Sequence, residues 1–154
     1  TLAGIALQEQ LEAQAFVLGG SDYCAPAQLV GDFVKGRPSQ ALGEVIPSYK
    51  PGVLPGDLHP SLPTYAIEAI REALPQFGKQ IRGFDRADAV LTGVETRTSS
   101  PVRITRDATS LQSLNTRGLF PAGEGAGYAG GILSAGVDGI KVAEAVALAM
   151  LADR

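Results

Sequence analysis

A glycine-rich stretch near the C-terminus carries the residues of this chain that are best suited to ligand binding. Residues 118–139 read GLFPAGEGAGYAGGILSAGVDG, in which Gly125, Gly127 and Gly130 are spaced as G-x-G-x-x-G. The loop follows a short apolar segment and precedes an alanine-rich helical pattern. Backbone without side chains can come close to a large ligand, and the first turn of a helix presents N–H groups and a positive dipole end to an anion. The pattern therefore indicates a phosphate-bearing cofactor.

Two common phosphate-binding folds do not fit the residues around this loop. A Rossmann unit needs a second parallel strand after the helix, and an acidic residue about 20 residues further on to hold the ribose. The residues after Gly130 are consumed by one helix, so we expect no such strand. A P-loop needs Gly-Lys-Ser/Thr after the glycines, which this sequence lacks. We expect a lone strand–loop–helix, and glycines that only permit tight helix–strand packing explain the pattern equally well.

Three arginines, Arg97, Arg103 and Arg106, lie close together upstream of the loop, beside a Ser-Ser-Pro turn. On a regular strand Arg97 would share a face with Glu95 and Ser99, because alternate side chains point the same way. A guanidinium there could hold a substrate carboxylate through two hydrogen bonds. A solvent-exposed strand edge protected by charge is the alternative interpretation.

Other common catalytic arrangements are missing from the sequence. The chain has one histidine, His59, and one cysteine, Cys24, so it offers no recognisable zinc site, intrachain disulfide or hydrolytic triad. We expect His59 to be a loop residue and Cys24 to be a buried, inert thiol. The catalytic residues stay unassigned.

The amino-acid composition limits the classes of protein to which the chain could belong. The 154 residues are 45% hydrophobic and 19% charged with a net charge of −3, which is typical of a globular chain and does not favour nucleic acid or an anionic membrane as partner. The apolar run 132–151 contains Asp138, Lys141 and Glu144, so we expect no membrane span. The single cysteine and the absence of a signal-peptide pattern at the N-terminus favour a cytoplasmic location.

Periodicity and turn residues predict an α+β chain. The expected helices are 2–17, 62–74 and 131–152, and the expected strands are 87–98, 102–105 and 118–122. We expect Pro75 to end or bend the second helix. The last helix is apolar nearly all round, so we expect it to be buried on most sides. The region 21–60 holds six prolines and is predicted to be a long loop, with helical turns only at 29–33 and 40–45.

The segment GLFPAGEGAGYAGGILSAGVDGIKVAEAVA closely resembles the C-terminal FAD-binding segment of two-domain FAD-dependent oxidoreductases, and is most similar to uncharacterised bacterial FAD-dependent dehydrogenases. Other pieces that look like this family are Leu11–Phe16 with Gly19-Gly20, Ala25-Pro26-Ala27, Ser48–Gly52 and Gly93–Arg103. The resemblance implies FAD as the cofactor, a small-molecule substrate that exchanges hydride with the flavin, and NAD(P)H as a candidate electron donor or acceptor.

The resemblance also implies roles for individual residues. Gly123 and Glu124 would contact the ribityl side of FAD. The N–H groups of three residues at the helix start would lie near the pyrimidine edge of the flavin, where reduced flavin carries negative charge, namely Gly130, Gly131 and Ile132. Gly125 and Gly127 belong to the same cofactor-binding loop. Tyr128 could pack beside the flavin or only cap the core. The substrate-binding candidates are Tyr128, Arg97 and Arg103; for the two arginines this follows from their chemistry, and the resemblance assigns them no role.

The chain departs from that family because it has no N-terminal ADP-binding βαβ unit, and it opens without methionine. We therefore expect the C-terminal portion of a longer oxidoreductase, with the missing N-terminal FAD domain as its partner. Residues 1–115 would form a substrate- or cap-side region, and residues 116–154 a strand–loop–helix that belongs to the FAD-binding α/β domain. We expect this portion alone to bind FAD weakly or not at all and to be inactive. The alternative is a non-catalytic folded module whose glycine loop serves packing only.

Overall fold

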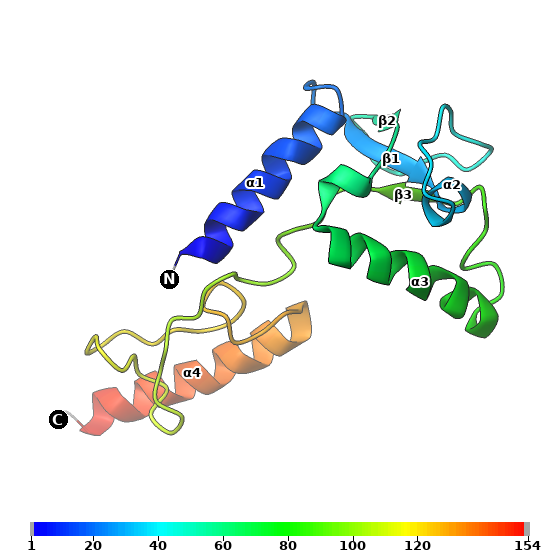
Figure 1. The fold of residues 1–154 in the computed structure, drawn as a ribbon. Helices are drawn as coiled ribbons and strands as arrows, with labels where there is room; N and C mark the ends of the chain where they lie inside the picture. The colour runs from blue at the N-terminus through cyan, green and yellow to red at the C-terminus, as the bar shows by residue number, and fades with distance from the viewer. Residues whose placement is uncertain (1, 153–154) are drawn as a thin grey trace. The chain divides into compact units, whose positions relative to one another are not determined.

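The chain combines helices with a small sheet, so the predicted α+β class is confirmed. The structure is a computed structural model and describes residues 2–152. In chain order, its elements are α1 (Ala3–Leu18), β1 (Ala25–Leu29), α2 (Val30–Val34), β2 (Val53–Pro55), the short 3-10 helix η1 (His59–Ser61), α3 (Thr64–Gln80), β3 (Val90–Thr92) and α4 (Ile132–Ala152) (Figure 1).

Two compact units make up the chain. One is Glu9–Glu95, and the other combines the first part of α1, up to Gln8, with the residues from Thr96 onward. The predicted division between residues 1–115 and 116–154 concerns the domains of a longer protein, and it stays a prediction. Residues 1, 153 and 154 of those two ranges lie outside the part of the chain that the structure describes.

The sheet of the Glu9–Glu95 unit has the order β2-β1-β3, with β1 parallel to β2 and antiparallel to β3. Both β1 and β2 lie in the region 21–60, where the prolines predicted only loop, and that prediction is wrong for these strands. Pro26 sits in the central strand because the sheet uses only its carbonyl oxygen, which accepts a hydrogen bond from the N–H of Gly93 at 2.9 Å. The strand therefore loses little from the missing N–H of proline.

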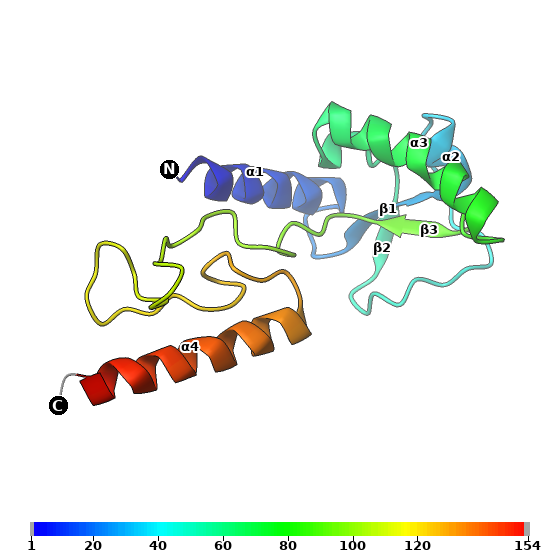
Figure 2. The ribbon, with the colours of Figure 1, turned by 90° about the horizontal axis from the view of Figure 1, so that it is seen from below.

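The core of this unit lies between the sheet and two helices, α2 and α3, which Figure 2 shows on the same side of the strands. Its buried side chains are Val30, Phe33, Leu58, Ile67 and Leu74. Helix α2 confirms the predicted turn at 29–33, whereas 40–45 forms no helix.

The buried side chain of Gln28 connects two loops to the core. Its amide N–H donates to the Arg37 carbonyl at 2.7 Å, and its amide oxygen accepts from the Leu58 N–H at 2.9 Å.

Helix α3 continues through Pro75 to Gln80, so the prediction that the proline ends this helix is wrong. Proline removes a single helical hydrogen bond. Packing offsets that loss, because Leu74 is buried in the core and the ring of Phe77 meets the ring of Phe84 edge-on at 5.4 Å. The first predicted helix is confirmed by α1, which stops before Gly19-Gly20 as expected.

The other unit consists mainly of an irregular segment, residues 96–131, that runs along α4 (Figures 1 and 2). The strand predicted over 87–98 is confirmed only for β3, and the strands predicted at 102–105 and 118–122 are not formed. A strand needs a neighbouring strand to satisfy its backbone groups. In this unit only one isolated bridge forms between described residues, from Arg106 to Ser113.

Helix α4 spans nearly the predicted residues, but its expected burial is not seen. Among the described residues of α4, Val142 is buried. By contrast, four other apolar residues of the helix are each more than half exposed, namely Leu133, Val137, Ile140 and Leu148. None of the helices formed by residues 2–152 combines the length and apolarity that crossing a bilayer requires.

Candidate cofactor site at the glycine loop

An ion pair fixes the glycine loop to helix α4. The guanidinium of Arg106 donates to both carboxylate oxygens of Asp138, from Nη2 at 2.6 Å and from Nη1 at 2.9 Å. One of those oxygens also accepts the backbone N–H of Gly123 at 2.8 Å. The side chains of Arg106 and Asp138 are only 9% and 13% exposed. The first residue of the loop is thus held by a carboxylate that projects from the helix following the loop.

These contacts stabilise the charged form of Asp138. The hydrogen bonds from Arg106, and next the N–H of Gly123, lower the pKa of Asp138 from 3.8 to about 2. The same carboxylate raises the pKa of Arg106 above its ordinary value. Both groups are therefore fully charged at neutral pH, and charge-assisted, bidentate pairs of this kind are among the stronger hydrogen-bonded contacts in proteins.

Tyr128 closes the loop on its other side. Its backbone N–H donates to the Gly123 carbonyl at 3.0 Å, and its hydroxyl accepts the backbone N–H of Arg106 at 2.9 Å. The guanidinium carbons of Arg106 and Arg103 lie 3.7 and 4.9 Å from the centroid of its ring. Tyr128 therefore joins the loop to the arginine-bearing segment through cation–π contacts.

The loop glycines differ in how much room the surrounding chain leaves for a side chain. Gly127 has a φ of +80°, and a Cβ there would lie 2.8 Å from the Val102 carbonyl oxygen. A Cβ on Gly130 would lie 3.3 Å from the Ser99 hydroxyl. A Cβ on Gly125 would meet nothing within 4 Å. Packing within the chain thus explains Gly127 but not Gly125, and Gly130 meets only the Ser99 hydroxyl, which can rotate away.

Two hollows border the loop. One, of about 220 Å³, brings Glu124 and Gly125 together with Arg97. The other, of about 350 Å³, brings Gly127, Tyr128 and Gly130 together with Arg103. Both are also lined by Ser99 and Ser100. The tertiary structure therefore gathers most of the predicted site residues around one serine pair.

Several predicted features differ from this arrangement. Arg97 lies in an irregular segment rather than in a strand, so the predicted strand face shared with Glu95 and Ser99 does not form. Arg97 and Ser99 nevertheless line the same hollow. Gly123, Gly131 and Ile132 line neither hollow. Gly131 directly precedes α4 and Ile132 is its first residue; the first N–H groups of this helix have no earlier helical carbonyl to bond and can serve an anion.

Sequence reasoning missed the pairing of Arg106 with Asp138. Each residue carried a signal of its own, since Arg106 belongs to the arginine cluster and Asp138 is one of the few charged residues in a mostly apolar helix. A charge on such a helix needs a partner when it faces inward. The partner lies 32 residues away in sequence, and no local pattern connects the two.

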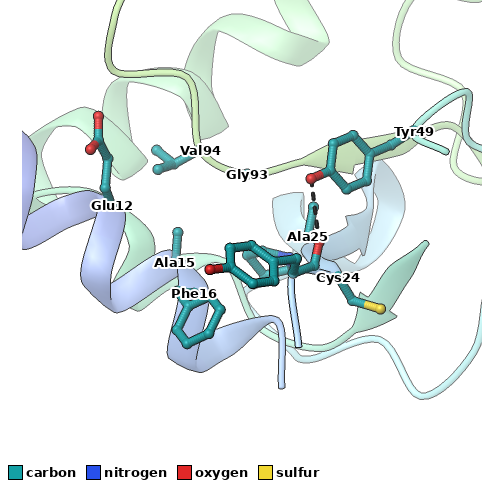
Figure 3. A pocket seen from close by; sticks show the side chains of 10 residues that line it. Glu12, Ala15, Phe16, Cys24, Ala25, Tyr49, Gly93 and Val94 are labelled. Atoms are coloured by element: carbon teal, nitrogen blue, oxygen red, sulfur yellow. Dashed lines mark hydrogen bonds between the residues drawn. The ribbon is translucent and has the colours of Figure 1, made fainter. Parts of the chain in front are cut away.

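Cys24 and His59 lie outside the two hollows at the glycine loop, and Cys24 is half-buried rather than buried as predicted. Cys24 lines a hollow of about 170 Å³ in the Glu9–Glu95 unit, and its sulfur points away from the Phe16 ring (Figure 3). In the same hollow the Tyr49 hydroxyl donates a hydrogen bond to the backbone carbonyl of Tyr23. The neighbouring Asp22 carboxylate raises the pKa of this thiol, which disfavours the reactive thiolate. His59 lies in η1 rather than in a loop. Within residues 2–152 no three His, Cys, Asp or Glu side chains gather as metal ligands would.

Comparison with known proteins identifies the family. Residues 1–98 match the family described as FAD-dependent protein, C-terminal domain-like. The chain belongs to this family. Over 143 residues, 93% of the chain, it is also 58% identical to an uncharacterized protein of Clostridium beijerinckii, and the match covers 27% of that protein. The chain thus spans about a quarter of the length of this relative. Membership of the FAD-dependent family supports association with FAD.

Proposed function

We propose that the chain is the C-terminal portion of an FAD-dependent oxidoreductase, and that its glycine loop, residues 123–131, binds the flavin cofactor in the complete protein. Family membership supports the cofactor, and the length of the relative from Clostridium beijerinckii supports a longer parent protein. The dehydrogenase activity, hydride transfer between a small-molecule substrate and the flavin, is part of the same proposal.

The observation that carries this proposal is the open space at Gly125 beside the carboxylate-bearing Glu124. Both residues line a hollow, and no contact of the chain itself explains the glycine. The ion pair of Asp138 holds the loop in place before any ligand arrives. A preorganised loop loses less entropy when it binds a ligand.

The chain's own residues would bind and orient the cofactor. The Glu124 carboxylate can accept hydrogen bonds from ribityl hydroxyls, and the N–H groups of Gly130, Gly131 and Ile132 can point at the flavin edge. The dipole of α4 favours negative charge at that edge. Bound flavin would supply the redox chemistry, because accepting and releasing hydride is a property of the cofactor.

The exposed apolar face of α4 supports a protein partner for this unit. Leu133, Val137, Ile140 and Leu148 are exposed along the helix, and contiguous apolar surface of this kind marks contact sites. We propose that the missing N-terminal FAD domain of the same protein covers this face and supplies the ADP-binding part of the site. The chain alone would then bind FAD weakly or not at all.

Flavin content of the full-length protein tests the proposal. We expect absorbance near 450 nm at close to one flavin per protein in the full-length form, and little in residues 1–154 alone. Glu124→Gln should lower the retained flavin, whereas Glu44→Gln, in the other unit, should not. Bleaching of the 450 nm band by NADH or NADPH tests the predicted electron donor. A flavin-free full-length protein, or retention unchanged by Glu124→Gln, contradicts the corresponding part of the proposal.

A second candidate function is a structural module whose glycine loop serves packing only. The close approach of Gly127 to Val102 favours it, because that contact requires glycine without any ligand. A folded full-length protein without flavin would support this candidate.

A further inference from the structure

We propose that Arg103 binds a carboxylate of the substrate in the hollow between the Ser99–Arg103 segment and the glycine loop. This inference rests on the proposed function, because it places the substrate beside the loop that would hold the flavin. It commits the substrate class to carboxylic acids.

The structure distinguishes Arg103 from the other two arginines of the cluster. Arg106 is neutralised by Asp138. Arg97 makes interactions of its own. Arg103, by contrast, forms no ion pair with any acid in the part of the chain that the structure describes. Its positive charge is therefore available to an anion from outside the chain.

The guanidinium of Arg103 is also held in a defined orientation. Its Nε donates to the Gly127 carbonyl at 2.9 Å, and its plane lies near the Tyr128 ring, 4.9 Å from the centroid. These two contacts leave the edge with Nη1 and Nη2 for a ligand. That edge matches the two oxygens of a carboxylate, and orienting it in advance reduces the entropy lost on binding.

The hollow that Arg103 lines has the polarity that a carboxylate needs. Its seven lining residues include Arg103 as the one charged side chain, together with the hydroxyls of Ser99 and Ser100. Among the described residues the Ser99 hydroxyl has no hydrogen-bond partner, whereas Ser100 donates to the Val102 carbonyl at 2.7 Å. Ser99 can therefore donate to the same anion as Arg103.

A carboxylate suits this hollow better than a phosphate group. One guanidinium edge supplies one positive charge and two parallel donors, which match the single charge and two oxygens of a carboxylate. A phosphate carries up to two charges on three or more oxygens, and proteins commonly hold it with several backbone N–H groups or several cations. Arg103 is the one cation that lines this hollow, so a phosphate there would depend on the backbone N–H groups of the glycine loop, and phosphate is therefore one of the ligands to titrate.

Calorimetric titration of the full-length protein with benzoate tests the inference. We expect benzoate to bind, and the neutral isostere benzamide and inorganic phosphate to bind at least about tenfold more weakly. Arg103→Gln should raise the Kd for benzoate at least about tenfold, because it removes a charged, bidentate donor. Arg103→Lys keeps the positive charge but loses the two parallel N–H donors of the guanidinium, so its Kd for benzoate should lie between those of the wild type and Arg103→Gln. The control Arg86→Gln removes an exposed arginine of the other unit and should leave binding unchanged.

Absorbance at 450 nm of each sample separates this inference from the proposed function. Retained flavin with benzoate binding that Arg103→Gln does not weaken overturns the carboxylate site and leaves the flavin proposal standing. Binding that depends on Arg103 in a flavin-free protein supports the carboxylate site and overturns the flavin proposal. Phosphate that binds as tightly as benzoate overturns the carboxylate assignment. Circular dichroism of each variant verifies that it is folded.

Discussion

Arg106 and Asp138 meet through two hydrogen bonds, of 2.6 and 2.9 Å, and the same carboxylate accepts the N–H of Gly123. The pair therefore connects the arginine cluster with two segments further along the chain, the start of the glycine loop and helix α4. Any ligand that the loop binds meets a backbone already fixed by this contact.

Asp138→Asn should destabilise the unit that contains the glycine loop by about 1–3 kcal/mol, because it leaves Arg106 largely buried without its charge partner. Urea denaturation measures this difference. A double-mutant cycle with Arg106→Gln isolates the interaction itself. Strictly additive effects of the two substitutions would show that the pair contributes nothing beyond its separate members.

The ion pair also predicts a dependence of stability on pH. The pKa of Asp138 is about 2 in the folded chain, below its ordinary value of 3.8. Its contribution is therefore fully present above pH 3.8 and is lost as the pH falls through about 2. The size of the loss is at most about 2.5 kcal/mol. Other carboxylates titrate in the same range, so the measured quantity is the stability difference between the wild type and Asp138→Asn. A difference that stays constant from pH 7 to pH 2 contradicts the prediction.

Two glycine substitutions separate packing from ligand binding. Gly127→Ala should destabilise the chain by about 1–3 kcal/mol, because the residue has a positive φ and its Cβ would press on the Val102 carbonyl. Gly125→Ala should change stability by less than about 0.5 kcal/mol, since its Cβ would enter open space. In the full-length protein Gly125→Ala should nevertheless reduce the flavin content measured at 450 nm. Full retention of flavin would show that the ligand does not approach Gly125.

The exposed face of α4 predicts a substitution whose effect depends on the rest of the protein. Ile140 is 64% exposed, so Ile140→Glu should change the stability of residues 1–154 by less than about 0.5 kcal/mol. If the proposed N-terminal FAD domain covers this face in the full-length protein, the same charge would be buried, and the melting temperature should fall by several degrees. Thermal denaturation of both forms gives the comparison. Equal effects in the two forms would show that this face is not covered.

Helices were the most predictable part of the fold, because their signals are local. Leu18 followed by Gly19-Gly20 marks the end of α1, and the long alanine-rich pattern marks α4. Strand β1 was not predictable in the same way. Its sequence, APAQL, contains a proline, and it forms a central strand only because β2 and β3 arrive on both sides of it. Such pairing joins residues far apart in sequence and leaves no periodic pattern.

The candidate site shows the same division. The sequence by itself determined which residues have suitable chemistry: the glycine loop with Glu124, and the arginines that precede it. The tertiary structure alone decided their partners, because Asp138 neutralises Arg106 and the Gly127 carbonyl orients Arg103. It also decided that Gly127 serves a contact within the chain while Gly125 faces open space. The physical reason is that residue type and spacing define the groups that can bind, whereas contacts between distant segments determine which of those groups remain available to a ligand.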